Sequence, residues 1–524
     1  MLEHPDYAIN LLAMLRAFAA PIASIWMLSL TPSTCPAEGT WDQLRGPQGS
    51  GCAPTSRAPT KLDPQHLGWK TPVPNGLSSP VCASGHIYLT AVEDGRLLTL
   101  AFDANTGKQL WRQLAPEVPL DRVHQAGSPA ASTPLVDEDH IYVYFGSFGL
   151  LCYDHEGKEQ WRKSIPTPKT LYGMSTSPVA YKDRVILVLD NDANLPKSTL
   201  SQSRILAVHK SSGETAWETA RPTQRSGWST PHIWPHAEGI DLVVLGSGRV
   251  AGYDPDTGIE RWFATGFSRE TIAMPVSGNE TLYVSAAMLG GVPDEQPDPQ
   301  PFWDAVMQFD ANQDQHLSRD EMTKHFTFPF RPELPPGHPG YGLPLPQDVE
   351  KRKGRLDGMF TGIDKNKDGL WSREEFLARL SFSRGKPILM AIRPGGEGDI
   401  TETHVTWEAH RNIPEIPSPI YHKDHIYLVR NGGFLAAIDA ADGKTCYVER
   451  LGGGGQYSAS PVIAGDRLYL ASDRGLVSVV RTGVAFEALH QADLEERIFA
   501  TPALDESTIY IRTEKHLMAF RSPD

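Results

Sequence analysis

The chain has 524 residues, of which 40% are hydrophobic and 21% charged, a balance that is ordinary for a globular protein and excludes a mostly disordered chain. Its 49 Lys and Arg residues and 63 Asp and Glu residues give a formal net charge of -14. Because no basic run interrupts this acidity, the composition argues against nucleic acid and anionic lipid as main partners.

The N-terminal residues 1–37 have the layout of a secretory signal. Arg16 precedes an apolar run, and small residues follow it up to a cleavage point after Ala37. This layout predicts export to the periplasm or cell envelope. A short uncleaved anchor helix and lipidation at Cys35 are alternatives, although the run is shorter than the ~20 residues of a typical span and Pro-Ser-Thr precedes the cysteine. No other segment is apolar enough to cross a membrane, so no integral membrane domain is predicted. The true start stays open, because acidic residues precede the run.

Residues 38–66 form an N-terminal extension, after which the sequence repeats itself. The clearest copies are AFDANTGKQLW (residues 101–111) and GYDPDTGIERW (residues 252–262), in which Asp, Thr-Gly and Trp recur at the same offsets. In each copy, Asp-x-x-Thr-Gly predicts a hairpin turn that Asp caps and in which Gly takes a positive φ angle. A Pro-led opening precedes each unit, and the eight openings begin at Ser78, Ser132, Thr176, Ser229, Ala273, Pro417, Ala459 and Ala500.

The spacing of the aromatic residues that close the units predicts the architecture. These residues are Trp69, Trp111, Trp161, Trp217, Trp262, Trp407, Tyr447 and Phe486. Most lie about 40 residues apart, which is the period of a four-stranded propeller blade. Eight units therefore predict an all-β fold, an eight-bladed β-propeller. The last unit ends before its own Trp strand, so we predict that the strand around Trp69 completes the eighth blade and closes the ring.

An insertion of about 100 residues interrupts the fifth unit. It contains DANQDQHLSRDE and DKNKDGLWSREE, which match 12-residue calcium loops with oxygen-bearing groups at the positions that Ca²⁺ coordination requires. The predicted ligands are Asp310, Asn312, Asp314, the His316 carbonyl, Ser318 and Glu321 in the first loop, and Asp364, Asn366, Asp368, the Leu370 carbonyl, Ser372 and Glu375 in the second. The flanking MFTGI and FLARL resemble helices, and Leu317 and Trp371 occupy the positions that pair two such loops. The sequence thus predicts an EF-hand pair over residues 291–386.

The two calcium loops differ at their sixth position, where the chain turns sharply. The second loop has Gly369 there, whereas the first has Gln315, which costs roughly 1 kcal/mol in a left-handed conformation. The second site is therefore predicted to bind calcium more strongly.

Other segments resemble calcium loops or connect them. The first FDAN, residues 102–105, has Gly107 and Leu114 at the fifth and twelfth loop positions and is predicted to be a blade turn. The acidic runs at residues 190–194 and 294–298 lack a closing Glu and are predicted to be ordinary loops. Residues 326–347 are too rich in proline and glycine for a helix. We expect this connector to wrap over the pair, or alternatively to recognise a ligand.

Further candidate site residues lie just before two inner strands. Arg221, Arg225 and Trp228, and Tyr172 and Ser175 one blade earlier, could bind a small molecule or a carbohydrate at the mouth of the ring. Packing between blades is the alternative for all five.

The five cysteines lie far apart and in an odd number, so neither a zinc spacing nor a fully paired disulfide framework is present. Cys82, Cys152 and Cys446 fall in strand-like repeats and are predicted to be buried thiols.

The Ala-x-Asp-x-x-Thr-Gly-x-x-x-Trp repeat resembles that of the pyrroloquinoline quinone (PQQ) type of β-propeller, which includes quinone-dependent alcohol dehydrogenases and the outer-membrane assembly lipoprotein BamB. The resemblance covers residues 68–289 and 387–524. It implies a binding or scaffold protein or, alternatively, a PQQ-dependent periplasmic dehydrogenase of alcohols or sugars. In the dehydrogenase relatives, the cofactor sits on the propeller axis against two adjacent cysteines. This sequence has no Cys-Cys pair, so its residues do not support PQQ and no catalytic residue is assigned.

Together these patterns predict a monomeric, exported propeller in two parts, residues 67–290 and 387–524, with an α-helical EF-hand pair inserted in the fifth blade. We expect a calcium-binding scaffold or binding protein of the cell envelope rather than an enzyme. Its expected partners are envelope proteins or a small ligand at the propeller face.

Overall fold

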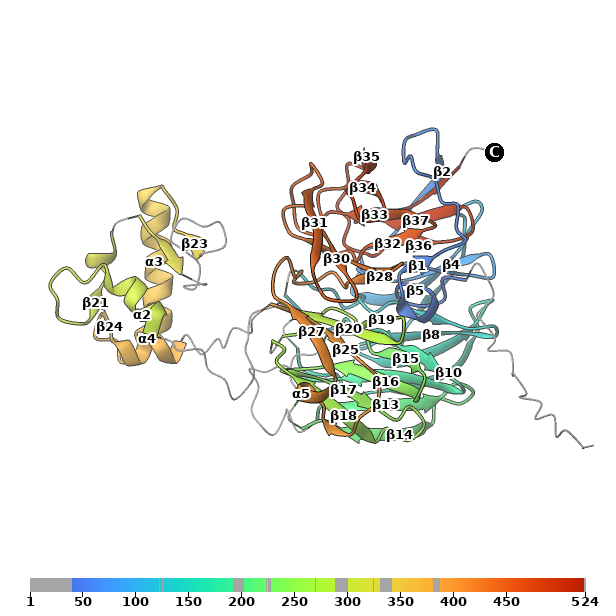
Figure 1. The fold of residues 1–524 in the computed structure, drawn as a ribbon, viewed down its shortest axis with the longest axis horizontal. Coiled ribbons are helices and arrows are strands. Elements are labelled where there is room, and N and C mark those ends of the chain that lie inside the picture. The colour runs from blue at the N-terminus through green and yellow to red at the C-terminus, as the bar shows by residue number, and fades with distance from the viewer. Residues whose placement is uncertain are drawn as a thin grey trace, which may run out of the picture. The chain divides into compact units, whose positions relative to one another are not determined.

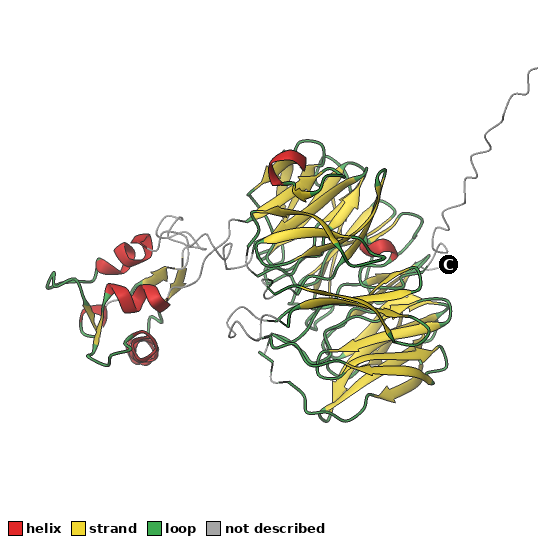
Figure 2. Cartoon of the chain, turned by 90° about the horizontal axis from the view of Figure 1, so that it is seen from below, coloured by secondary structure: helices red, strands yellow, loops and turns green. Residues whose placement is uncertain are grey.

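The structure is a computed structural model that describes residues 40–121, 123–124, 126–170, 172–191, 202–222, 224, 228–268, 270–287, 300–323, 325–329, 342–379 and 387–522. The predicted export segment lies outside these residues. Eight sheets, each built on four antiparallel strands, form the blades of a propeller (Figure 1 and Figure 2). The predicted all-β, eight-bladed fold is confirmed.

The blades follow one another along the chain. Blades one to four contain β3 (Val81–Ala83), β4 (His86–Glu93), β5 (Arg96–Asp103), β6 (Gln109–Leu114); β7 (Leu135–Val136), β8 (His140–Phe145), β9 (Gly149–Asp154), β10 (Glu159–Ser164); β11 (Val179–Tyr181), β12 (Arg184–Leu189), β13 (Arg204–His209), β14 (Thr215–Ala220); and β15 (His232–His236), β16 (Gly239–Leu245), β17 (Arg249–Tyr253), β18 (Glu260–Thr265). Blades five to eight contain β19 (Val276–Gly278), β20 (Thr281–Ala286), β25 (Ile388–Ile392), β27 (Val405–Ala409); β28 (Ile420–His422), β29 (His425–Arg430), β30 (Phe434–Asp439), β31 (Thr445–Arg450); β32 (Val462–Ala464), β33 (Arg467–Ala471), β34 (Leu476–Arg481), β35 (Ala488–Asp493); and β36 (Ala503–Leu504), β37 (Thr508–Arg512), β38 (His516–Arg521), β2 (Leu67–Pro72).

In the first blade, the fourth strand is the least buried of the four. In the first blade, all of β3 is buried, whereas residues of β6 alternate between exposed and half-buried positions. This alternation is expected of an outer strand with one face toward water. Cys82 and Cys152 are buried as predicted. The prediction for Cys446 is wrong, because this residue lies exposed in the outer strand β31.

The ring closes where the sequence predicts. Strand β2 pairs antiparallel with β38, with Trp69 opposite Ala519. The strand around Trp69 is thus the fourth strand of the eighth blade, and it joins the beginning of the ring to its end.

A repeated tryptophan contact ties blades to their neighbours. The indole N–H of the fourth-strand Trp donates to a main-chain carbonyl of the next blade. In the first blade, Asp103 Oδ1 caps the turn between β5 and β6 by accepting the Thr106 N–H at 2.8 Å. The indole bonds run from Trp69 to Ala104, Trp111 to His155, Trp161 to Lys210, Trp217 to Pro255 and Trp407 to Ala440, at 2.7–3.2 Å. In the first blade Gly107 has a φ of 69°, as the turn motif predicts.

Replacing Gly107 by Ala tests this contact, and Gly85 supplies a matched control. A Cβ atom at Gly107 would lie 2.4 Å from the Trp69 ring, whereas at Gly85, which has a φ of 75°, it would meet nothing within 4 Å. We expect Gly107→Ala to lower the free energy of unfolding by about 1–3 kcal/mol more than Gly85→Ala, because only the first substitution displaces an indole. Chemical denaturation of both variants measures the difference, and equal losses would contradict a tight contact.

A ring of hydrogen bonds runs around the axis at the Pro-led openings. In seven of the eight links, the main-chain N–H of the residue before the proline donates to a Ser or Thr hydroxyl of the next blade. The links are Ser79 to Thr133, Thr133 to Ser177, Ser177 to Thr230, Met274 to Ser418, Ser418 to Ser460, Ser460 to Thr501 and Thr501 to Ser79, at 2.9–3.0 Å. The fifth blade interrupts the ring, because Met274 has no hydroxyl to accept from Thr230.

The fifth blade also carries the insertion, between β20 and β25, which pair directly with Tyr283 opposite Ala391. The inserted elements are α2 (Gln300–Met307), β21 (Leu317–Ser318), η2 (Glu321–Thr323), β22 (Thr327–Pro329), β23 (Gly342–Pro344), α3 (Val349–Ile363), β24 (Leu370–Trp371) and α4 (Arg373–Arg379). The side chain of Asp348 caps α3 by accepting the N–H of Lys351 at 2.9 Å. MFTGI lies in α3, and FLARL lies in α4 as far as it is described. None of the helices in the described part of the chain is long and apolar enough to span a membrane.

Four short elements complete the described fold: η1 (Pro47–Gly49), β1 (Cys52–Ala53), β26 (Gly398–Asp399) and α5 (Thr401–His404). Strand β26 pairs in parallel with β18, so the fifth blade folds back onto the fourth at the point where other blades have the Asp-x-x-Thr-Gly turn.

Candidate functional site

The first predicted calcium loop is folded around its own carboxylates. Glu321 Oε2 accepts hydrogen bonds from the N–H and the hydroxyl of Ser318, both at 2.8 Å. Asp310 accepts the N–H groups of Asp314 and Gln315 at 3.2 and 3.0 Å. The loop therefore turns its oxygen-bearing side chains inward.

The second loop repeats this arrangement with one difference. Glu375 Oε2 accepts the Ser372 hydroxyl at 2.8 Å, and Asp364 Oδ2 accepts the Gly369 N–H at 3.0 Å. Asp364 is only 9% exposed, and its other oxygen, Oδ1, is buried and has no hydrogen-bond partner among the described residues. An unpartnered buried carboxylate oxygen is costly and points to a group that the protein itself does not supply.

The sixth position of both loops has the left-handed backbone that the sequence predicts. Gln315 has a φ of 64° and Gly369 a φ of 84°. The first loop therefore carries the conformational cost of a side chain at this position, and the second does not.

The loops pair with each other through β21 and β24. Leu317 lies opposite Trp371, and Ser318 opposite Leu370. Leu317 and Trp371 are fully buried, and their pairing is the one expected for two calcium loops placed back to back.

The closing glutamates of both loops are held in their ionised form. Hydrogen bonds from the Ser318 N–H, and then from its hydroxyl, lower the pKa of Glu321 against the effect of burial. Burial raises the pKa of Glu375, but the Ser372 hydroxyl and the N–H groups of Asn366, Ser372 and Lys365 outweigh it, so this pKa is also below its ordinary value. Within the described ranges, no three His, Cys, Asp or Glu side chains already surround a common point.

One segment of the chain runs along the inner edges of the blades. Residues 40–58, hereafter the axial segment, lie at the free inner edges of the blades. Trp41 exchanges two main-chain hydrogen bonds with Cys82 of β3, at 2.7 and 2.8 Å, and β1 pairs in parallel with β32. Gly49 packs against Met274, because a Cβ atom there would lie 2.2 Å from its methyl group. The sequence indicated only an extension here, because its contacts all involve distant blades.

Arg45 anchors the axial segment. Its Nη2 donates to the Pro419 carbonyl at 2.7 Å, while Nε and Nη1 have no partner among the described residues. Burial lowers the pKa of this guanidinium to about 10.

These axial residues do not fit PQQ. Main chain and the Arg45 side chain line the inner edges of the blades, and the thiols of Cys52 and Cys82 belong to two different segments rather than to an adjacent pair.

Arg221, one of the candidate pocket residues, forms a buried ion pair. Its Nε and Nη2 donate to Asp190 at 3.1 and 3.0 Å, and its Nη1 donates to the Tyr253 hydroxyl at 3.0 Å. The two charged side chains are 2% and 0% exposed. Arg221 thus joins the third blade to the fourth. The remainder of the acidic run after Asn191, the run at residues 294–298, and Arg225 lie outside the described residues.

The other candidate pocket residues also pack between blades. Trp228 is 4% exposed and donates its indole N–H to the Gly173 carbonyl at 3.0 Å. The ring of Tyr172 meets the Trp228 ring edge to face at 5.5 Å between centroids, and Ser175 Oγ donates to the Trp228 carbonyl at 3.5 Å. The structure brings these three residues together as packing contacts.

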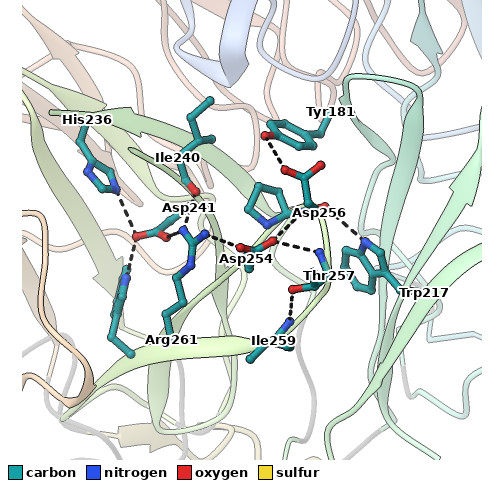
Figure 3. A network of polar contacts seen from close by, with 12 residues as sticks. Tyr181, Trp217, His236, Ile240, Asp241, Asp254, Asp256, Thr257, Ile259 and Arg261 are labelled. Carbon is teal, nitrogen blue, oxygen red and sulfur yellow. Dashed lines mark hydrogen bonds and ion pairs between the residues drawn. The ribbon is translucent and has the colours of Figure 1, made fainter. Parts of the chain in front are cut away.

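A polar network lies in the fourth blade and reaches the third, where Tyr181 and Trp217 bond to the turn of the fourth blade (Figure 3). Asp241 accepts hydrogen bonds from His236 at 3.2 Å, Arg261 at 2.7 Å and the Trp262 indole at 2.7 Å, and Arg261 also contacts Asp254. Trp262 is therefore bonded within its own blade, unlike the five tryptophans that reach the next blade. A hollow of about 690 Å³, lined by Glu238, Glu260 and Glu397 among others, opens beside the network.

A second hollow, of about 310 Å³, lies between the eighth and first blades. Arg512 lines it, but its Nη1 donates to the Ser78 and Thr90 carbonyls at 3.0 and 2.9 Å. This buried guanidinium serves first to hold two blades together.

Comparisons with known proteins agree with the fold. A family model described as outer membrane protein assembly factor BamB matches residues 60–188, 101–289 and 397–524, which together are more than half of the chain. The search of curated proteins gives no match.

Solved structures resemble the chain at low identity. BamB from Moraxella catarrhalis is 10% identical, with a TM-score of 0.48 over 87% of this chain and 99% of that one. A quinohemoprotein alcohol dehydrogenase from Pseudomonas putida HK5 is 12% identical, with a TM-score of 0.49 over 92% of this chain and 80% of that one. The corresponding enzyme from Comamonas testosteroni is 14% identical, with a TM-score of 0.40 over 94% and 82%.

Proposed function

This chain belongs to the family of outer membrane protein assembly factor BamB, whose members are PQQ-like β-propellers, and we propose that it is an exported, calcium-binding member that acts as a binding or scaffold protein of the cell envelope. The calcium sites of this proposal are the two loops of the insertion, and the propeller supplies the rigid frame.

The observation that carries the calcium proposal is the unpartnered oxygen of Asp364. This oxygen is buried at the first position of a 12-residue loop in which Asp364 Oδ2 and Glu375 accept hydrogen bonds from the loop's own main chain. A cation at that point would offset the cost of burying the carboxylate.

The ligands of each proposed ion are hard oxygen donors. Asp310, Asn312, Asp314, the His316 carbonyl, Ser318 and Glu321 would hold the first, and Asp364, Asn366, Asp368, the Leu370 carbonyl, Ser372 and Glu375 the second. When bound, calcium supplies charge compensation that orders both loops. The second site is the stronger one in this proposal, because Gly369 avoids the strain that Gln315 carries.

The scaffold part of the proposal rests on the contacts that fix the blades. The indole bonds between blades, the hydrogen bonds to Ser and Thr hydroxyls at the Pro-led openings and the axial segment along the inner edges make a rigid frame, so we expect recognition at exposed loops and the insertion. The family description names outer membrane protein assembly, and by analogy we expect envelope proteins as partners. Fold alone does not select them.

Titration calorimetry of the full chain with Ca²⁺ tests the proposal. We expect two binding events in the wild type, and only the weaker one after Asp364→Ala combined with Glu375→Ala. Asp310→Ala with Glu321→Ala should instead remove the weaker event, because each loop holds its own ion. Asp103→Ala is the matched control, since it changes the other FDAN and should leave both events in place.

Absence of calcium heat in the wild type would refute the calcium proposal. A parallel titration of the calcium-loaded protein with PQQ should give no heat, because the axial segment lines the inner edges of the blades and the chain has no adjacent cysteine pair. Stoichiometric PQQ uptake with dye reduction by alcohols or sugars would refute the scaffold proposal in favour of a dehydrogenase.

A further inference from the structure

The inserted helices and loops share one apolar core, and the connector between the loops belongs to it. The cluster contains Trp303, Val306, Leu317, Met322, Phe326, Leu345, Leu356, Phe360, Ile363, Trp371 and Phe376. Phe326 and Leu345 come from the connector, and all the others come from the two helix–loop–helix units.

The two connector residues are anchored side by side. Phe326 is 8% exposed and Leu345 is 2% exposed. The Leu345 N–H donates to the Phe326 carbonyl at 3.0 Å, directly beyond the paired strands β22 and β23. The Phe326 ring lies 4.4 Å from the Phe309 ring between centroids. The connector thus reaches into the core from both of its ends.

This arrangement bears on what calcium would do. In sensor pairs, calcium opens the helices and exposes an apolar groove that takes a target helix, whereas buffer pairs barely open. A segment that is covalently tied to the pair competes with any external target at an effective concentration in the mM range. Here such a segment already buries two large apolar side chains among those of both units.

Building on the proposed calcium binding, we infer that Phe326 and Leu345, at the two ends of the connector, are built-in occupants of the apolar core between the two units, so that calcium stabilises a closed insertion and does not expose a docking groove. The roles of the two parts are then distinct. The loops hold the ions, and Phe326 and Leu345 keep the core covered in both the calcium-free and the calcium-bound states.

Fluorescence of the dye 8-anilinonaphthalene-1-sulfonate, which brightens on exposed apolar surface, tests this inference in the full chain. We expect no increase on adding calcium to the wild type. Phe326→Ser combined with Leu345→Ser should give a several-fold calcium-dependent increase, because the core then opens without its occupants. Val349→Ser is the control, since Val349 lies on α3 but is 63% exposed, and it should behave like the wild type.

The outcomes separate this inference from the calcium proposal. If the wild type gives calcium heat and also a calcium-dependent rise in dye fluorescence, the occupant inference is wrong and calcium binding stands. If the wild type gives no calcium heat, the calcium proposal itself fails. If the double serine variant loses calcium binding, the test rests on the two measurements of the wild type. Calcium heat without a rise in dye fluorescence in the wild type then supports the inference.

Discussion

Arg221→Met is expected to lower the free energy of unfolding by about 3–5 kcal/mol at neutral pH. The guanidinium of Arg221 meets both oxygens of Asp190 in a site where the two side chains are 2% and 0% exposed. Methionine fills a similar volume but leaves the carboxylate of Asp190 buried without its cation. The loss is therefore the cost of an uncompensated buried charge, not of a cavity.

A double substitution tests whether the loss comes from the uncompensated charge of Asp190. Arg221→Met with Asp190→Leu removes both charges and should recover most of the lost stability, because a buried ion pair can be replaced by apolar residues at little cost. Arg249→Met is the matched control, since its bidentate pair with Glu260 is 25% and 32% exposed and should contribute under about 1 kcal/mol. Chemical denaturation measures all three variants. A loss as small as that of the control would show that water reaches the Arg221 pair.

The blade turns could be predicted from sequence because their chemistry is local. Asp103 caps its turn by accepting the N–H of Thr106, three residues along the chain, and Gly107 takes the backbone that glycine alone adopts without strain. Ring closure could also be predicted from the sequence. The strand around Trp69 has no unit before it, and the last unit lacks its own Trp strand, so the two complete one blade. The Pro-led openings could also be recognised in the sequence. The hydrogen bonds from their main-chain N–H groups to Ser and Thr hydroxyls of the next blade could not.

The axial segment escaped prediction because its partners are far away in sequence. Arg45 donates to a main-chain carbonyl at Pro419, 374 residues later, and no side chain at that distance marks the contact. The same reason applies to Arg221, which the sequence left open between a ligand site and packing. Its partner Asp190 stood in an acidic run that resembled an ordinary loop.

The insertion lies between these two cases. The pairing of Leu317 with Trp371 depends on fixed spacing, so it could be expected from the sequence. The unpartnered oxygen of Asp364 could not, because it depends on how the Asp364 side chain is buried in the folded loop.

Asp42 should make the stability of the protein depend on pH through the axial segment. Its main-chain carbonyl accepts the Val136 N–H at 2.8 Å, and its Oδ1 has no partner among the described residues. Burial raises the pKa of Asp42 to about 6, and Asp137 adds to this, whereas a main-chain hydrogen bond and Lys210 oppose it. The carboxyl is thus favoured in its neutral form in the folded protein.

Because the folded pKa lies above the ordinary 3.8, the protonated carboxyl stabilises the fold below about pH 4, and this contribution is lost as the pH rises through about 6. Relative to Asp42→Asn, the wild type should therefore lose roughly 2 kcal/mol of unfolding free energy between pH 4 and pH 7. Asp63→Asn should show the opposite sign at lower pH, because a hydrogen bond from His66 lowers the pKa of Asp63 and its contribution is lost only as the pH falls below about 4. Denaturation of the three proteins from about pH 2 to about pH 7 measures both slopes. A difference between wild type and Asp42→Asn that stays constant with pH would mean that Asp42 ionises as freely as in water, and hence that the axial segment leaves the channel open at this residue.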